Sequence, residues 1–199
     1  MNMLKTSEKW ADDETIIHDI KLVASQLKKA TIKIRRNQYC QNEFSDLSAN
    51  IIEILKTWTG STYIGARKSK QLEDAFQMFF LNLLEYTLEL KKKDKNHPFC
   101  KTLYQGNIYR VLGSNNPKNK EIIKPRYSNI FVSWSKNENI PTYYMLEKFY
   151  GPVTKLKSKI CGEQYGIDLT VFGVSKIGEQ EIVFPTLKEY TEIQEIIKN

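Results

Sequence analysis

The chain of 199 residues is poor in the residue types from which many active sites are built. Its two histidines, His18 and His97, are too few for a histidine-rich metal site or for a triad that relies on an imidazole base. The three cysteines, Cys40, Cys100 and Cys161, are odd in number and far apart, which disfavours a disulfide framework and a zinc site. The sequence therefore predicts chemistry without a bound metal.

Two kinds of characteristic segment are also missing. No glycine-rich phosphate loop follows a strand-like run, which disfavours the Rossmann mode of binding a dinucleotide. No apolar run approaches the length of a membrane-spanning helix, and residues 1–14 are too polar for a secretory signal. We therefore expect no membrane association and a cytoplasmic protein, acting in the cell that makes it or delivered into a target cell by other machinery.

The hydrophobic pattern changes its character near residue 97. Before it, apolar residues recur at helical spacing in three segments, 16–27, 51–58 and 72–88, and the third is the clearest stripe. After His97-Pro98, short β-rich runs alternate with Gly, Asn and Pro up to Phe184. The pattern predicts an α+β protein with a helical region at 1–97 and a β-rich region at 98–199, packed as one compact unit.

Two motifs place pairs of polar side chains on one face of a strand. Glu179 and Glu181 flank Gln180 at the start of a β-rich run, so both carboxylates emerge on the same side. A fixed carboxylate stabilises the positive charge that develops on a sugar when a glycosidic bond breaks. Ser133 and Ser135 end an apolar strand pattern, also on one face, where their hydroxyls can bind a ligand close to the backbone.

The third motif is Tyr109-Arg110, inside a strand-like run bounded by Gly106 and Gly113. A guanidinium is costly to bury among apolar residues unless it meets an anion, and its planar fork matches phosphate oxygens. Arg110 therefore indicates a contact with an anionic group.

In this order, Arg110, Ser133-Trp134-Ser135 and Glu179-Gln180-Glu181 resemble the arginine, Ser-x-Ser and Glu-x-Glu signature of the mono-ADP-ribosyltransferases of the toxin-like class. Trp134 stands where that family usually has Thr. The resemblance covers roughly the second half of the chain, and it implies N-terminal helices packed on a split β-sandwich that holds NAD between two small sheets. It further implies an NAD-dependent transferase that moves ADP-ribose to a macromolecule.

The resemblance also assigns roles to single residues. Glu181 holds the ribose hydroxyl and stabilises the cation, Glu179 activates an arginine acceptor, and Ser133 supports the catalytic glutamate. Arg110 contacts the phosphate or ribose of NAD. An aromatic side chain between the two last motifs stacks on the nicotinamide, although Tyr143 and Phe149 can equally pack a helix against the sheet. The expected catalytic residues are Glu181, Glu179, Ser133 and Arg110, and the expected NAD-binding residues are Arg110, Tyr109, Ser133, Ser135 and Tyr143.

The acceptor stays open at this stage. A net charge of +7 and a pI near 9.1 favour attraction to RNA, DNA or an acidic assembly, whereas Glu179 favours arginine on a protein. The family also implies a toxin of a toxin–antitoxin or anti-phage system, a phage-type host modifier or an injected effector, with a neutralising protein partner. The alternative function is a non-enzymatic basic module that binds RNA through lysines and stacking tyrosines.

Overall fold

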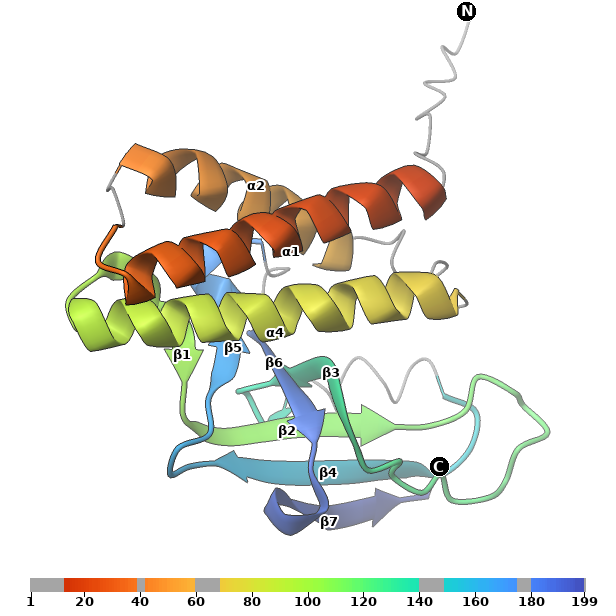
Figure 1. Cartoon of the computed structure of the whole chain (residues 1–199). Coiled ribbons are helices and arrows are strands. Elements are labelled where there is room, and N and C mark those ends of the chain that lie inside the picture. Colours follow the sequence, from red (N-terminus) through yellow and green to blue (C-terminus); the bar gives the residue numbers. More distant parts are fainter. Residues whose placement is uncertain (1–12, 39–41, 60–68, 140–148, 175–179, 199) are drawn as a thin grey trace, which may run out of the picture.

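The computed structural model describes residues 13–38, 42–59, 69–139, 149–174 and 180–198. Three helices form a layer on one side of a sheet: α1 (Asp13–Arg35), α2 (Asn42–Thr59) and α4 (Lys70–Lys93). Figure 1 shows α1 and α4 running side by side along this layer. The Asn82 side chain of α4 joins them by donating to the backbone carbonyl of Ala24 at 2.9 Å.

Helix α4 matches the helix expected at 72–88. Its N-cap is Ser69, whose hydroxyl accepts a hydrogen bond from the N–H of Leu72 at 3.4 Å. It ends after three lysines, which suit the negative end of a helix dipole. The predicted stripe is buried or partly buried along its whole length. Burial of this stripe fixes the face that α4 turns toward the rest of the protein.

The strands follow the helices and pair in one antiparallel sheet of order β1-β5-β6-β3-β2-β4-β7. The strands are β1 (Leu103–Tyr104), β2 (Gly106–Leu112), β3 (Ser128–Ser135), β4 (Val153–Ile160), β5 (Gly166–Asp168), β6 (Glu181–Thr186) and β7 (Thr191–Ile197). Short 3-10 helices, η1 (Pro98–Thr102), η2 (Leu169–Phe172) and η3 (Lys188–Tyr190), connect them to their neighbours. Figure 1 shows the sheet curling, so that β2, β4 and β7 cross below β5 and β6.

The pairing of the sheet is least extensive between β2 and β3. Along the described residues these strands share one register pair, Tyr109 with Ser135, whereas β2 pairs with β4 along its whole length. Beyond that pair a helix side chain replaces the missing strand. Gln77 donates to the carbonyl of Phe131 at 3.2 Å and accepts from its N–H at 2.6 Å. On the side of β3 that faces away from β6, the backbone of Phe131 is thus satisfied by Gln77 instead of by a strand.

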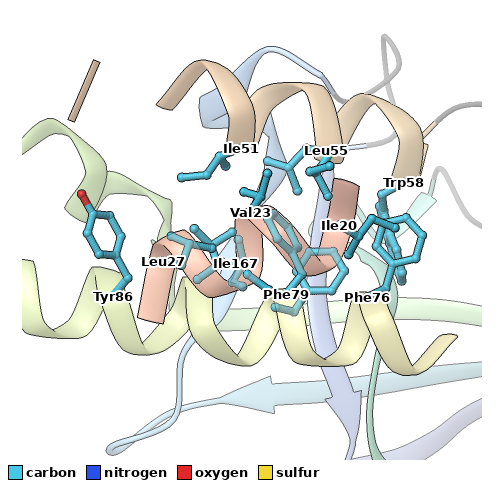
Figure 2. Close-up of a cluster of buried hydrophobic side chains, with 14 of the residues drawn as sticks. Ile20, Val23, Leu27, Ile51, Leu55, Trp58, Phe76, Phe79, Tyr86 and Ile167 are labelled. Carbon is cyan, nitrogen blue, oxygen red and sulfur yellow. The ribbon is translucent and has the colours of Figure 1, made fainter. Parts of the chain in front are cut away.

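Two hydrophobic cores lie on opposite sides of the sheet. The larger core joins helices α1, α2 and α4 to Phe131, Ile167 and Val183, and Figure 2 shows Ile167 among its helical side chains. The second core lies on the far face and gathers Ile108, Trp134, Leu156, Ile160, Ile182 and Phe184. Because side chains alternate along a strand, adjacent residues of β3 and β6 contribute to different cores. The prediction of an α+β protein with N-terminal helices packed on a sheet is confirmed.

Candidate functional site

The three motif-bearing strands are neighbours in the sheet, in the order β6, β3, β2. Ser135 at the end of β3 lies opposite Glu181 at the start of β6, and Tyr109 of β2 lies opposite Ser135. Cross-strand partners project their side chains to the same face. Glu181, Ser135 and Tyr109 therefore form one row across three strands that are far apart in the sequence.

The carboxylate of Glu181 is the centre of this region. Glu181 is only 6% exposed to solvent. The indole Nε1–H of Trp58 donates to its Oε1 at 2.8 Å, and the hydroxyl of Ser133 donates to the same oxygen. A buried carboxylate is costly unless hydrogen bonds replace its lost water, and these two donors supply such bonds. Ser133 and Glu181 are thus joined by a hydrogen bond, and the supporting role that the resemblance assigns to Ser133 stays a prediction.

Trp58 is a member of the site that the sequence did not reveal. It belongs to α2, is 2% exposed, and meets the rings of Phe76 and Phe80 edge to face, with centroids 5.0 and 4.6 Å away. Figure 2 shows Trp58 beside Phe76 at one end of the helical core. This packing fixes the direction of the indole N–H toward Glu181. In the sequence, Trp58 is simply the last apolar residue of a helical stripe.

The backbone before Glu181 has an uncommon conformation. Gln180 has a φ of 43°, in the left-handed region that residues other than glycine rarely adopt. Its carbonyl accepts a hydrogen bond from the N–H of Lys136 at 3.1 Å, which ties it to the end of β3. Strained residues held by their surroundings are concentrated at functional sites. The conformation of Gln180 therefore marks its neighbour Glu181 as a candidate functional residue.

The two serines of the Ser-x-Ser motif have different tasks. Ser133 binds Glu181, as described above. The hydroxyl of Ser135 instead donates to the carbonyl of Asn137 and accepts from its N–H, both at 3.0 Å. This pattern closes a local turn at the strand end. The expected contact of Ser135 with NAD stays a prediction, and its visible role is structural.

Arg110 is not brought to Glu181. Because Tyr109 projects toward the side of Ser135 and Glu181, its neighbour Arg110 projects to the far face. There it lies opposite Leu156, a residue of the second core, and it lines a pocket with Arg126. The contact of Arg110 with NAD stays a prediction that this arrangement does not support. Tyr109 lies on the side of Glu181 but is 8% exposed, which leaves it little surface for a ligand.

Two of the expected residues lie outside the described part of the chain. Glu179, the first glutamate of its motif, falls in 175–179, and Tyr143, the expected aromatic partner of nicotinamide, falls in 140–148. Their roles stay predictions.

A second buried carboxylate occupies the opposite face of the neighbouring strand. Asp168 of β5 is 6% exposed and lies opposite Ile182, one residue along from Glu181. Lys136 donates to its Oδ2 at 2.8 Å, and its Oδ1 accepts from the N–H of Thr170 at 2.9 Å, which caps η2. Burial, together with the nearby charge of Asp168, raises the pKa of the Tyr104 hydroxyl. Asp168 is thus part of an ion pair with a structural task.

Within the described residues, no three side chains of His, Cys, Asp or Glu gather into a group suited to a metal ion. None of the described helices combines the length and the apolar character needed to cross a membrane. Comparison of the chain with models of known protein families, with curated proteins and with solved structures found no match. The motifs and the geometry around Glu181 are therefore the features of this chain that point to a function.

Proposed function

We propose that the protein is a mono-ADP-ribosyltransferase that cleaves the nicotinamide–ribose bond of NAD and transfers ADP-ribose to a macromolecule. The observation that carries the proposal is the hydrogen bond from Ser133 to Glu181. It joins two motifs that are 48 residues apart in the sequence, in the pairing that the resemblance implies. A chance occurrence of both motifs would not require them to lie on adjacent strands with their polar side chains in contact.

The shape of the sheet supports the finer fold assignment. With a single register pair between β2 and β3, the sheet falls into one part with β1, β5, β6 and β3 and another with β2, β4 and β7. Side chains of both parts meet in the second core. Two small sheets that pack across a shared core form a split β-sandwich, the arrangement expected for this class.

The proposed chemistry uses Glu181 as a fixed negative charge. When the bond between the anomeric carbon and the nicotinamide nitrogen breaks, its electron pair leaves with nicotinamide and the ribose becomes cationic. The carboxylate of Glu181 stabilises this cation, as carboxylates do in glycoside hydrolysis. A nucleophile of the acceptor then bonds to the anomeric carbon and releases its proton. Trp58 and Ser133 hold Oε1 of Glu181, so the charge needs no reorganisation during the reaction.

The proposal includes two classes of acceptor for ADP-ribose. The charge of +7 supports RNA or DNA, and the Glu-x-Glu motif supports arginine on a protein. An enzyme of this kind would act as a toxin of a toxin–antitoxin or anti-phage system, or as a phage-type modifier of host machinery. A toxin that acts in its own cell needs a neutralising protein partner.

The test is transfer of label from NAD labelled in the ADP-ribose portion. Purified protein, Glu181→Gln and the matched control Glu192→Gln, which changes an exposed carboxylate on β7, are incubated with cell lysate. Protein and nucleic acid are then separated, and nicotinamide release is measured in parallel. We expect transfer by the unchanged protein and by Glu192→Gln, and a loss of about 10²–10³-fold in Glu181→Gln. Equal activity of Glu181→Gln, or no use of NAD by the unchanged protein, would contradict the proposal.

One observation favours a second candidate function. Helix α1 exposes Lys21, Lys28, Lys29 and Lys33 to solvent, which gives it a basic surface. A non-enzymatic RNA-binding module would use such a surface for phosphate contacts. It would bind RNA with strong salt dependence, use no NAD and be indifferent to Glu181→Gln, so the same samples distinguish the two functions.

A further inference from the structure

The loop between β2 and β3, residues 113–127, is rich in cations. Its exposed basic residues are Lys118, Lys120, Lys124 and Arg126, and Glu121 is its one acidic residue. Figure 1 shows the loop at the side of the molecule where β2 ends and β4 begins. The loop therefore presents a group of basic side chains to solvent at this end of the two strands.

The chain that leads into β4 is anchored to this loop through its backbone. The N–H of Tyr150 donates to the carbonyl of Ser114 at 3.3 Å. Gly151 lies so close to the loop that an added Cβ would be 2.3 Å from the carbonyl oxygen of Asn119 and 3.9 Å from the Cα of Lys120. Tyr150 is thus held beside the basic part of the loop.

The ring of Tyr150 lies in solvent although its backbone is held. The residue is 66% exposed, more than any other large hydrophobic residue in the described ranges. It belongs to neither hydrophobic core, so packing does not account for an aromatic side chain at this position. A flat ring held at the surface offers a face on which a nucleic-acid base can stack.

The combination of cations and an exposed ring matches one class of ligand. Ammonium groups contact the phosphates of a nucleic acid, and an aromatic ring stacks on an unpaired base. Inside a duplex the bases are already stacked on one another, so a ring at the protein surface reaches them only in a single strand. The ligand that fits this surface is therefore single-stranded nucleic acid.

We propose that the loop 113–127 and Tyr150 form a binding site for single-stranded nucleic acid. Lys118 and Lys120 contact the phosphates, and Tyr150 stacks on a base. The site would serve a transferase whose acceptor is nucleic acid, and equally a protein that only binds RNA. The inference therefore requires neither the use of NAD nor a catalytic role for Glu181.

The first test is fluorescence anisotropy of the full chain with labelled oligouridylate of about 12 nucleotides, in the absence of NAD. Oligodeoxyuridylate of the same length separates RNA from DNA, and a duplex of that length separates stacking from charge alone. We expect a Kd of about 10⁻⁴–10⁻⁶ M for at least one of the single strands. The duplex should bind several-fold more weakly despite its higher charge density. Equal or tighter binding of the duplex, or a Kd above about 10⁻³ M for both single strands, would overturn the proposal.

Substitutions of Tyr150 test the stacking contact. Tyr150→Ala should weaken binding of the single strand by about fivefold to a hundredfold, the range for loss of one stacked base. Tyr150→Phe keeps the ring and should bind like the unchanged protein, which shows that the loss does not come from misfolding. Unchanged affinity in Tyr150→Ala, or an equal loss in both variants, would overturn the proposal.

Paired lysine variants locate the phosphate contacts. The double variant Lys118→Gln and Lys120→Gln should lower the magnitude of the slope of log Kd against log salt by about 1.4, or about 0.7 for each phosphate contact on a single strand. The control Lys21→Gln and Lys28→Gln removes the same charge from the exposed surface of α1 and should leave the slope unchanged. A larger change of slope in the α1 variant would place the strand on α1 and overturn the proposed site.

Discussion

Glu181 and Asp168 are two equally buried carboxylates on neighbouring strands, each 6% exposed, yet they are held in different ways. Asp168, on the far face, meets the ammonium of Lys136 at 2.8 Å and caps a 3-10 helix. Glu181, on the helix-facing side, receives hydrogen bonds from the neutral groups of Trp58 and Ser133. Asp168 is thus one half of an ion pair, and Glu181 is an acceptor oriented by two hydrogen bonds.

The difference indicates which carboxylate is suited to chemistry. An adjacent ammonium neutralises the charge of Asp168, so little of its field can act on a ligand. The described donors to Glu181, the indole N–H of Trp58 and the hydroxyl of Ser133, are neutral groups, and they fix the position of its carboxylate. A carboxylate held in a fixed position in a water-poor surrounding is suited to the stabilisation of a sugar cation. Substitutions at these two carboxylates and at their neighbours test this difference.

Removing the charge of Asp168 should have the largest effect on stability. In Asp168→Asn the amide can still cap η2, but Lys136, whose side chain is 27% exposed, loses its counter-ion. We expect the free energy of unfolding to fall by about 3 kcal/mol, as for other partly buried ion pairs that lose one member. Urea denaturation of the purified variant and of the unchanged protein measures this difference in the free energy of unfolding.

The paired variant is Glu181→Gln, whose amide oxygen can still accept from Trp58 and Ser133. It should lose less stability than Asp168→Asn because the amide keeps both of these hydrogen bonds, whereas Asp168→Asn removes the carboxylate that meets the ammonium of Lys136. A larger loss in Glu181→Gln than in Asp168→Asn would show that the two carboxylates do not differ in the way described.

The next prediction compares two tryptophans on the two faces. The Nε1–H of Trp58 donates to the carboxylate of Glu181 at 2.8 Å, and that of Trp134 donates to the carbonyl of Phe184 at 2.9 Å. Both residues are 3% exposed or less. Trp58→Phe should cost about 2 kcal/mol and Trp134→Phe about 1 kcal/mol, because a bond to a charged acceptor is worth more than one to a neutral acceptor.

Thermal or urea unfolding of both variants provides the measurement. Since each change removes the same atoms, packing losses largely cancel in the difference between them. Equal costs would mean that the indole of Trp58 adds nothing to the carboxylate beyond packing.

Several of these relations were predictable from the sequence, and several were not. Period-two geometry correctly places Ser133 on the same face as Ser135, and the apolar stripe of α4 correctly identifies its buried side. The same geometry also requires that Tyr109 and Arg110 point to opposite faces. Which of the two shares a face with Glu181 depends on the register between β2 and β3, and a single sequence does not contain that register.

The contact of Trp58 with Glu181 could not be predicted from the sequence for another reason. The two residues are 123 positions apart, and their meeting depends on how α2 packs over β6. A helical stripe predicts which face is buried, but not the strand beneath it. The Lys136–Asp168 pair was missed likewise, since neither residue belongs to a motif.

The third prediction separates the two serines. Ser133→Ala removes a hydrogen bond to a carboxylate, and Ser135→Ala removes one to the backbone of Asn137. Ser133→Ala should cost about 1.5 kcal/mol of unfolding free energy and, under the proposed function, slow NAD consumption about tenfold. Ser135→Ala should cost about 0.5–1 kcal/mol and leave Glu181 in place. The result that would count against these roles is a larger loss of NAD consumption in Ser135→Ala than in Ser133→Ala.

The smallest effect concerns a carboxylate in the helical layer, away from both faces of the sheet. Glu89 of α4 is 8% exposed and accepts from Lys92 at 2.8 Å and from Arg35 of α1 at 3.2 Å. The hydrogen bond from Lys92, followed by that from Arg35, lowers the pKa of Glu89 below its ordinary value. Like Asp168, it is a carboxylate neutralised by cations.

A lowered pKa in the folded state means that the unfolded chain takes up the proton first as the pH falls. The stability contributed by Glu89 is therefore complete above its ordinary pKa of about 4.3 and is lost as the pH falls through its lower folded value. In Glu89→Gln, the decline of unfolding free energy between about pH 5 and pH 3 should be shallower than in the unchanged protein. An equal slope would mean that the contacts of Glu89 with Lys92 and Arg35 add no measurable charge interaction, as for many exposed pairs.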